Sequence, residues 1–327
     1  MIKVEIGKNE QNQRLDKFLR KYLENAPLSF IYKAIRKDVK INGKRGKEDT
    51  VLALGDEVTL YISDSDFEKF RKKQRTGRSL RQFSIAYEDE NLLAAVKPLG
   101  LLTHGDSQEK KNHLANQVID YLIERGSYSP RLEKTFTPAP VNRLDRNTTG
   151  LVLFGKNNLA LQELNRMIRG KDNVHKFYLT IVCGDLKKPV CLRDRMLKDQ
   201  EANRITVLPM EGQGRDMETR AEPLAHGRRD GRVFTLVKVE IITGRTHQIR
   251  AQLAKAGYPL IGDAKYGSRG VNEYVKKTFG LTTQLLHAYE LSFSGCDGHL
   301  AYLDNVVIRA ELPDMFAGIK KQIFEQD

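Results

Sequence analysis

Short apolar segments with the length and composition of β-strands dominate the chain from residue 83 onward. Clear examples are GLVLFGK from residue 150, KFYLTIVCG from residue 176 and RVFTLVKVEIITG from residue 232. These segments are rich in β-branched and aromatic residues, which favour strands. Most predicted strands follow one another without the crossover helix that parallel neighbours require. We therefore predict an α+β fold with a large mixed, mostly antiparallel sheet.

The first 62 residues have the pattern of a separate small α/β-hairpin unit. RLDKFLRKYL, from residue 14, has apolar residues at helical spacing, and a second helix is expected to start near Ser29. The dipeptide Asn42-Gly43 then lies between two short alternating segments and predicts a tight β-hairpin.

Basic residues gather on the second predicted helix and on the hairpin. Four recur at i, i+3, i+4 and i+7, provided that the helix runs that far, and two more follow in the hairpin. The residues concerned are Lys33, Arg36, Lys37, Lys40, Lys44 and Arg45. Such a surface suits phosphate groups of RNA, whereas the alternative is an ordinary solvated face.

The charge of the whole chain supports a polyanionic partner. Its 55 Lys and Arg exceed its 42 Asp and Glu, which leaves a net charge of +13. Nucleic acid is the first candidate and an anionic membrane surface the second. No segment reaches the roughly 18 consecutive apolar residues of a membrane span, and the N-terminus has no signal-peptide pattern. We expect a cytoplasmic protein that acts as a monomer and does not bind membranes.

Three regions follow from these patterns. Residues 1–62 form the predicted small unit, residues 63–82 form a polar, basic linker, and residues 83–327 form the large sheet unit. The three cysteines have no metal or redox spacing, and neither a phosphate-binding glycine loop nor a dinucleotide motif is present. We therefore expect no nucleotide or metal cofactor.

Asp145 is the first candidate site residue. It lies in PVNRLDRNTTG, an irregular segment with a proline at its start and a glycine at its end, just before an apolar strand. A short acid on such a loop is either a site residue or a turn residue that bonds its own backbone. The same RLD triplet ends at Asp16, where a position at the start of a helix indicates a structural role.

A second segment, ITGRTHQIRAQLAKAG, offers a partner for Asp145. A predicted strand ends at Gly244 and a helix begins near Thr246, which leaves Arg250 free to point back at a carboxylate. An arginine partner keeps an aspartate ionised in a desolvated pocket. The alternative is that Arg250 is a surface arginine of the helix.

Several segments, taken in order, resemble the RluA-type pseudouridine synthases. NRLDRNTTG resembles their HRLDxxTSG motif, KFYLTIVCG their second motif and TGRTHQIRAQLA their third; VKPLGLLTHG and LLHAYELSF are also similar. This resemblance covers about residues 85–310, and residues 13–62 resemble an S-four-type RNA-binding domain. Asn142 and Thr149 depart from the motif, which commonly has His and Ser there.

The resemblance implies an RNA pseudouridine synthase that uses one aspartate and no cofactor. Asp145 would be the catalytic aspartate, Arg250 its partner and Tyr178 a flat face against a uracil that has been flipped out of its helix. Arg143 would clamp the RNA backbone or fill the gap left by the base. Arg245 and His247 would contact phosphates.

The resemblance also favours large-subunit ribosomal RNA as the substrate, with transfer RNA as the alternative. A non-catalytic RNA-binding or ribosome-assembly protein remains a second class of function, and an RNA methyltransferase a third. The sequence alone leaves open which uridine reacts, and whether Asp145 is a nucleophile or a base.

Overall fold

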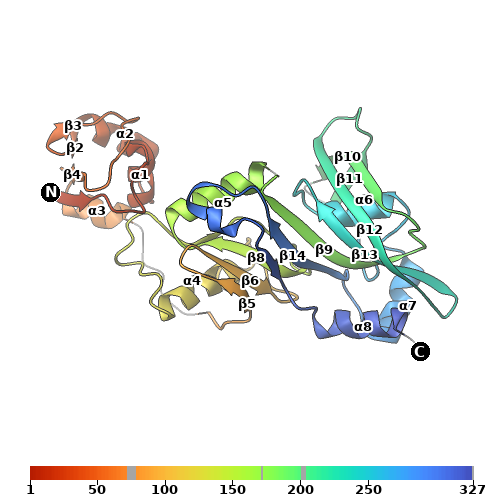
Figure 1. The fold of residues 1–327 in the computed structure, drawn as a ribbon. Helices are drawn as coiled ribbons and strands as arrows, with labels where there is room; N and C mark the ends of the chain where they lie inside the picture. The colour runs from red at the N-terminus through yellow and green to blue at the C-terminus, as the bar shows by residue number, and fades with distance from the viewer. Residues whose placement is uncertain (72–78, 171, 200–203, 326–327) are drawn as a thin grey trace.

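Two β-sheets, one small and one large, organise the chain (Figure 1). The computed structural model describes residues 1–71, 79–170, 172–199 and 204–325. The N-terminal unit holds a four-stranded sheet in the order β1-β4-β2-β3, and the rest of the chain builds an eleven-stranded sheet.

The N-terminal unit packs its helices against its antiparallel sheet. Its elements are β1 (Ile2–Glu5), α1 (Leu15–Tyr22), α2 (Leu28–Lys37), β2 (Val39–Ile41), β3 (Lys44–Arg45), β4 (Glu57–Leu60) and α3 (Asp64–Phe70). Leu15, Phe18 and Leu19 of α1 are buried with Ile31 and Ile35 of α2, as the helical spacing predicts. The β2–β3 hairpin turns at Asn42 and Gly43, both with positive φ, which confirms the Asn-Gly prediction.

Two details of this unit differ from the sequence prediction. The helix α2 begins at Leu28 after the N-cap Pro27 and ends at Lys37, so Lys40 does not extend the helical stripe. Lys40 lies instead in β2, where its ammonium is 5.2 Å from the centre of the Tyr61 ring. The helix ends early because Val39 enters the sheet, opposite Leu60 of β4.

The helix α3 lies within the segment expected to be a linker. Its Phe70 is buried in the core of the N-terminal unit, and Ser63 caps the helix by accepting a hydrogen bond from the Asp66 backbone. Residues 72–78 of that segment lie outside the described residues.

The large sheet has the order β11-β10-β12-β13-β9-β14-β8-β6-β5, with β15 beside β14 and β7 beside β8. Its strands are β5 (Ser84–Glu88), β6 (Leu92–Lys97), β7 (Ala139–Pro140), β8 (Thr149–Gly155), β9 (Val174–Cys183), β10 (Val190–Asp199), β11 (Arg204–Leu208), β12 (Arg215–Arg229), β13 (Arg232–Ile241), β14 (Leu286–Phe293) and β15 (Val307–Arg309). The β14–β8 pair is parallel, and the other pairs are antiparallel. The predicted mixed, mostly antiparallel sheet is therefore confirmed.

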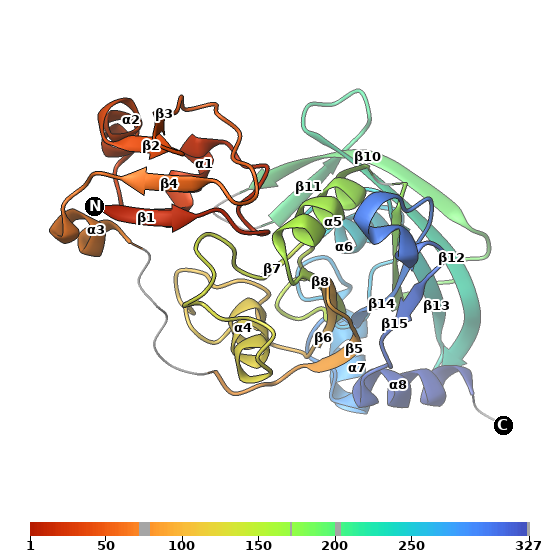
Figure 2. The ribbon, with the colours of Figure 1, turned by 60° about the vertical axis from the view of Figure 1, so that its left-hand side comes forward.

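Helices cover both faces of this sheet (Figures 1 and 2). They are α4 (Leu114–Glu124), α5 (Asn158–Gly170), α6 (Gln248–Lys255), α7 (Arg269–Phe279), the 3₁₀ helix η1 (Gly298–Leu303) and α8 (Asp314–Phe324). In β9, alternate residues face opposite ways: Tyr178 and Val182 pack with α4 and α6, whereas Leu179 and Ile181 pack with α7 and α8. None of the helices in the described segments is long and apolar enough to cross a lipid bilayer.

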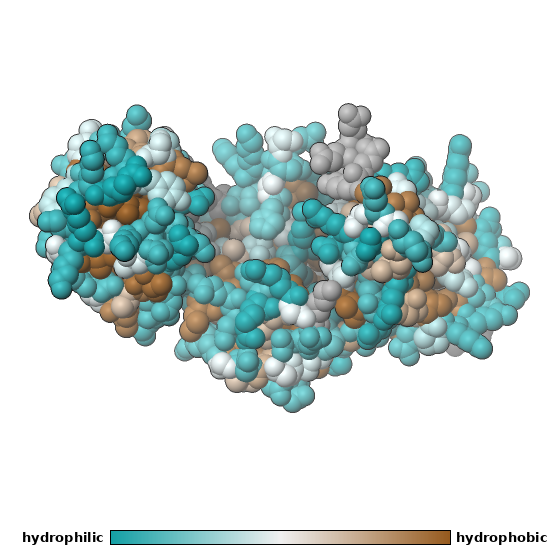
Figure 3. All heavy atoms as spheres, turned by 90° about the horizontal axis from the view of Figure 1, so that it is seen from above, coloured by the Kyte–Doolittle hydropathy of each residue, from teal (hydrophilic) through white to brown (hydrophobic). Residues whose placement is uncertain are grey.

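Polar contacts join the two units. Asn9 donates a hydrogen bond to Glu133 and accepts one from the backbone N–H of Asn158, at 2.8 and 2.9 Å. Lys134 also donates to the carbonyl of Glu5. Figure 2 shows the N-terminal unit beside β7 and α5. The space-filling view from above shows mostly hydrophilic side chains over both units, with scattered apolar patches (Figure 3).

Candidate active site

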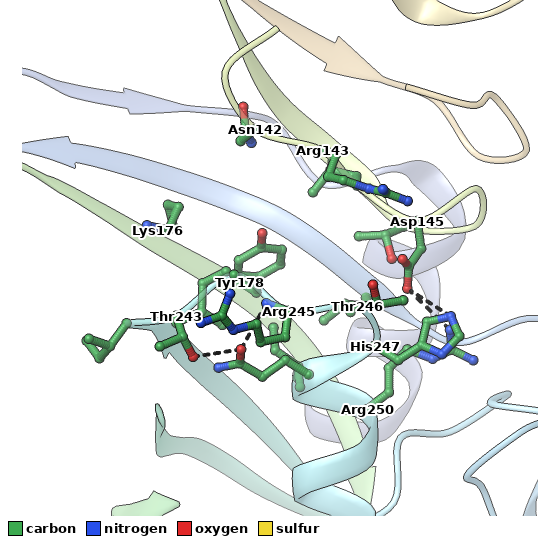
Figure 4. Close-up of a pocket in the computed structure, with 18 of the residues that line it drawn as sticks. Asn142, Arg143, Asp145, Lys176, Tyr178, Thr243, Arg245, Thr246, His247 and Arg250 are labelled. Carbon is green, nitrogen blue, oxygen red and sulfur yellow. Dashed lines mark hydrogen bonds and ion pairs between the residues drawn. The ribbon is translucent and has the colours of Figure 1, made fainter. Parts of the chain in front are cut away.

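A cavity of about 400 Å³ lies where the loop before β8, the strand β9 and the start of α6 meet. Its volume is within the range of ligand pockets. Figure 4 shows the side chains of His247 and Arg250 directed at the Asp145 carboxylate. The cavity is lined by all six residues that the sequence predicts for the site beyond the N-terminal unit, namely Arg143, Asp145, Tyr178, Arg245, His247 and Arg250.

The loop that carries Asp145 is held by a tight turn and by strand β8. The Asp145 carbonyl accepts the Thr148 N–H at 3.0 Å. Gly150 has φ +107°, and a Cβ there would lie 2.1 Å from the Ala288 carbonyl oxygen, so only glycine fits. Asn142, where the related motif has His, donates to Leu151 O and accepts from Leu153 N. Its amide therefore anchors the loop to β8.

The segment after β6 supports the same loop from the other side. The Lys97 side chain is fully buried, and its ammonium donates to the carbonyls of Pro98, Leu101 and Arg146 at 2.8–3.0 Å. Burial lowers the pKa of Lys97 to about 7, against the opposing effect of the nearby Asp145. Lys97 therefore ties the residue that follows Asp145 to the end of β6.

Arg250 binds two carboxylates, and the buried one is its principal partner. Its Nε and Nη2 donate to Asp263 at 2.6 and 2.9 Å, while its Nη1 lies 3.3 Å from Asp145 Oδ2. Burial alone would oppose both charges of the Arg250–Asp263 pair. Their mutual hydrogen bonds outweigh this effect and leave the pKa of Arg250 raised and that of Asp263 lowered. Asp263 thus fixes the guanidinium that faces Asp145.

The two oxygens of Asp145 have different surroundings. Oδ2 faces Arg250 at 3.3 Å and His247 Nε2 at 3.7 Å. Across the described segments no donor reaches Oδ1. The carboxylate is therefore oriented through one oxygen and keeps the other for a reacting group in the cavity.

Tyr178 forms part of the cavity wall next to Asp145. Only 7% of its surface is exposed, and burial followed by the nearby Asp145 charge raises its pKa far above the ordinary value. It is a neutral phenol at neutral pH. No residue of the described chain makes a hydrogen bond to its hydroxyl, so the ring face and the hydroxyl are available to a ligand.

His247 lies inside the site rather than at its rim. Its side chain is 8% exposed, and its Nδ1 is 3.1 Å from the Tyr266 hydroxyl. The backbone of His247 is left-handed, with φ +52°, which makes α6 begin at Gln248 and not at Thr246. The structure thus gives His247 neighbours within the site, and its contact with a phosphate stays a prediction.

The two remaining arginines lie at the mouth of the cavity. Arg143 and Arg245 are both exposed, and Arg245 donates to the Asp216 carbonyl at 3.2 Å and so is anchored to β12. Arg143 directly precedes the buried Leu144 and points along the same loop as Asp145 (Figure 4).

The basic residues of the N-terminal unit do not line the cavity. Lys40 is half-buried, and the other five are exposed: Lys33, Arg36, Lys37, Lys44 and Arg45. The two ribbon views agree that α2 lies beside β2 and β3 (Figures 1 and 2). We call these five exposed residues the N-terminal basic face.

The sequence reasoning missed three residues that build the site. Asp263 and Tyr266 lie in GDAKYG, and Lys97 precedes a proline in VKPLG. A signal was present for Asp263 and Lys97, because a charged residue between apolar segments and glycines needs a partner if it is buried. Among the described residues, no cluster of three or more His, Cys, Asp or Glu side chains is placed to hold a metal ion.

Comparison with known proteins identifies a family. Residues 91–255 match the family model described as RNA pseudouridylate synthase. The chain is 33% identical over 297 residues to ribosomal large subunit pseudouridine synthase C of Vibrio vulnificus (strain CMCP6), which covers 89% of this chain and 88% of that protein. The protein of the same name from Escherichia coli (strain K12) is 32% identical over 300 residues, with the same coverage.

Solved structures support the fold. Human RNA pseudouridylate synthase domain containing 4 aligns with a TM-score of 0.53 over 73% of this chain and 92% of that chain, at 20% identity. Human RNA pseudouridylate synthase domain containing 1 gives a TM-score of 0.51 over 74% and 94%, also at 20% identity.

Proposed function

Because the chain belongs to the RNA pseudouridylate synthase family and is a pseudouridine synthase, we propose that it isomerises specific uridines of large-subunit ribosomal RNA, with Asp145 as its catalytic residue. The observation that carries the proposal is the Asp145 carboxylate in the cavity, held through Oδ2 by Arg250 and open at Oδ1.

The reaction requires few chemical groups. The bond between uracil N1 and ribose C1′ breaks, the base turns, and a bond forms between C5 and C1′. The proton on C5 is lost and N1 gains one, so the product is an isomer of the substrate. A single carboxylate acting on the ribose, as a nucleophile or as a base, is sufficient if water is kept out.

We assign Asp145 Oδ1 to the ribose and Tyr178 to the base. The buried Tyr178 ring offers a flat face for the uracil, and its hydroxyl makes no competing hydrogen bond to the described part of the chain. Arg250, fixed by Asp263, orients the Asp145 carboxylate through Oδ2.

A uridine must leave its helix to enter a cavity of this kind. Arg143, exposed and two residues before Asp145, is placed to contact the RNA from which the base was taken. Arg245, at the mouth of the cavity, is placed for a phosphate of the same strand.

The choice of ribosomal RNA rests on the relatives and on the N-terminal unit. The relatives from Vibrio vulnificus and Escherichia coli carry ribosomal large subunit in their names. The N-terminal basic face offers a second set of cations, away from the cavity, for the phosphates of a folded RNA. We also propose that the enzyme acts as a monomer, and that it acts in the cytoplasm, where bacterial ribosomal RNA is made.

The test compares RNA from cells that lack the protein with RNA from cells in which a variant is restored. Pseudouridines are mapped by chemical labelling and primer extension, because the isomerisation leaves the mass unchanged. We expect specific ribosomal positions to lose the mark, to regain it with the wild type, and to stay unmarked with Asp145→Asn.

Asp16→Asn is the matched control, because Asp16 ends the same RLD triplet but pairs with Arg14 in the N-terminal unit. We expect it to restore the marks. Marks restored by Asp145→Asn would reject the catalytic assignment. Marks lost only from transfer RNA would reject the ribosomal substrate, and no lost mark in either RNA would reject the proposal as a whole.

A further inference from the structure

His247, Tyr266 and Asp145 form a chain of polar contacts that ends at the catalytic carboxylate. The Tyr266 hydroxyl accepts the backbone N–H of Ile205 at 2.8 Å and lies 3.1 Å from His247 Nδ1. The other ring nitrogen, Nε2, lies 3.7 Å from Asp145 Oδ2. The tautomer of His247 therefore decides whether Nε2 offers an N–H donor or a lone pair to the Asp145 carboxylate.

Both ends of the chain favour the proton on Nε2. The Tyr266 hydroxyl has one proton to donate, and its oxygen already accepts from Ile205. If His247 Nδ1 accepts this proton, Nε2 carries the ring hydrogen and points it at Asp145. With the proton on Nδ1, an Nε2 lone pair would instead face the carboxylate, and two acceptors repel each other.

The neighbours of the His247 ring and its backbone conformation orient it toward Asp145. The backbone of His247 is left-handed, with φ +52°, which is uncommon for any residue other than glycine and is consistent with a residue held by its surroundings. The Tyr266 ring packs edge-on against the imidazole at 5.7 Å and lies 5.3 Å from the Arg250 guanidinium. One tyrosine thus positions both groups that face Asp145 Oδ2.

The charges around His247 agree with a neutral ring. Burial lowers its pKa, and the cations Arg250 and Lys265 act in the same direction, whereas Asp145 and Asp263 oppose them. A neutral imidazole adds a directed hydrogen bond without a further positive charge beside Arg250.

We propose that His247 is a positioning residue for Asp145: Tyr266 holds it as the neutral Nε2–H tautomer, which donates to Oδ2 when RNA closes the site. The distance of 3.7 Å is longer than a formed hydrogen bond, and such bonds commonly tighten in the substrate complex. Donation to Oδ2 leaves Oδ1 as the reacting oxygen. The inference rests on the proposed role of Asp145.

Two substitutions at His247 separate the hydrogen bond from the backbone conformation. His247→Gln places an amide N–H near the position of Nε2, whereas His247→Asn reaches only the position of Nδ1. Asn adopts the left-handed backbone more readily than Gln. If only the backbone conformation matters, His247→Asn should keep more activity than His247→Gln. If the hydrogen-bond donor to Asp145 matters, His247→Gln should keep more.

We expect His247→Asn to lower kcat about 10- to 100-fold with KM within about twofold, and His247→Gln to recover at least about half of that loss on a logarithmic scale. Rates are measured under single turnover with ribosomal RNA fragments that contain the mapped uridine. Urea unfolding midpoints confirm that each variant is folded. A kcat for His247→Asn equal to that of the wild type, or above that of His247→Gln, would overturn the proposal.

The tautomer is measured directly on the full-length enzyme without RNA. Histidine-selective ¹⁵N labelling gives the ring nitrogen shifts, and the His247→Gln spectrum assigns the resonance. We expect a pyrrole-type Nε2 and a pyridine-type Nδ1 near neutral pH, with this preference lost in Tyr266→Phe. A pyrrole-type Nδ1 or a protonated ring in the wild type would overturn the proposal.

The two readouts separate this inference from the proposed function. If wild type and Asp145→Asn leave RNA equally unmodified, the proposed function fails whatever tautomer the spectrum shows. If the wild type is active and Asp145→Asn is not, while His247→Asn is fully active, only the positioning role of His247 fails.

Discussion

Arg250 connects two carboxylates that differ in burial and in function. Asp263 is fully buried and receives two of its hydrogen bonds, whereas the Asp145 side chain is 21% exposed and receives one from the remaining nitrogen. A planar guanidinium can do both because its donors diverge from one rigid group. A lysine has the charge but not this geometry.

Arg250→Lys is therefore expected to damage both stability and activity. The bidentate pair with buried Asp263 is lost, and breaking such a pair costs about 3–5 kcal/mol. Urea unfolding measures the stability, and single-turnover assays measure kcat. Arg269→Lys is the control, because the Arg269–Glu273 pair is solvent-exposed and such pairs contribute about 0–1 kcal/mol. Equal losses in the two variants would contradict the role of Arg250.

Gly150→Ala tests the close approach of β8 to β14. The added Cβ would meet the Ala288 carbonyl at 2.1 Å on a backbone with φ +107°, so we expect a loss of at least about 2 kcal/mol. Gly280→Ala also has positive φ, +70°, but its Cβ meets nothing within 4 Å, and about 1 kcal/mol is expected. Urea unfolding measures the free energy of unfolding of both variants. Equal losses would show that the structure relieves the clash at residue 150.

At the scale of elements, the site depends on how β6 and β14 hold the loop before β8. Thr149 Oγ1 lies 2.8 Å from His287 Nδ1 across the parallel β14–β8 pair, and His287 Nε2 faces the Ala310 carbonyl at 3.5 Å. Lys97, at the end of β6, donates hydrogen bonds to the carbonyls of Pro98 and Leu101, which follow β6, and to that of Arg146 in the loop before β8. These contacts fix the start of β8, and with it the position of Asp145.

His287 predicts how stability changes with pH. Burial lowers its pKa from the usual 6.5 to about 4. Between these values the unfolded chain binds more protons than the folded one, so stability rises with pH and is lost as the pH falls from 6.5 to 4. The difference corresponds to about 3 kcal/mol. We expect His287→Gln to lose this part of the pH dependence in urea unfolding; an unchanged dependence would contradict it.

Lys97→Met removes a donor from three carbonyls. That of Leu101 is buried, whereas those of Pro98 and Arg146 are partly buried, and the Arg146 carbonyl keeps the Gly100 N–H as a donor. An unsatisfied buried polar group costs about 1–3 kcal/mol, and the Leu101 carbonyl is the buried one, so we expect the free energy of unfolding measured in urea to fall by about 1–3 kcal/mol. We also expect kcat to fall, because the Asp145 loop loses its contact with the end of β6. Lys277→Met, on the exposed surface of α7, is the control and should change stability by less than about 0.5 kcal/mol. A folded Lys97→Met enzyme with wild-type stability would refute the claim that Lys97 holds the Asp145 loop.

At the scale of the molecule, the N-terminal basic face and the cavity are the two places that we propose for RNA. The two units are in contact through the hydrogen bonds that Asn9 makes with Glu133 and Asn158. Phosphate contacts far from the reacting base add affinity without contributing to the chemistry.

We therefore expect the triple variant Lys33→Gln, Arg36→Gln, Lys37→Gln to bind ribosomal RNA more weakly while keeping kcat. Each lost phosphate contact reduces the slope of log K against log salt by about 0.7–0.9. Filter binding over a salt series measures the slope. The control removes three exposed cations from α7 with Arg269→Gln, Lys276→Gln and Lys277→Gln. Equal slopes for the two triple variants would reject RNA contact by the basic face.

Several parts of the fold follow from local patterns. The helix α1, the Asn42-Gly43 hairpin and the strands β8, β9 and β13 lie where periodicity and turn residues predict them. The early end of α2 was missed because sheet pairing of Val39 outweighs the helical spacing of the lysines. The helix α3 was missed because its segment is short and charged. Its stability depends on one side chain, Phe70, which is buried in a core that forms only in the tertiary structure.

The sequence by itself determined the kind of sheet and the residues Asp145, Tyr178 and Arg250 that meet in the cavity, because short-range patterns and ordered motifs carry that information. Only the tertiary structure decided that Arg250 pairs first with Asp263 and that His247 turns toward Asp145. Those outcomes depend on distances between segments far apart in the chain and on a left-handed backbone at one residue. Packing of the whole sheet determines the Arg250–Asp263 pair and the orientation of His247, and no local sequence pattern encodes them.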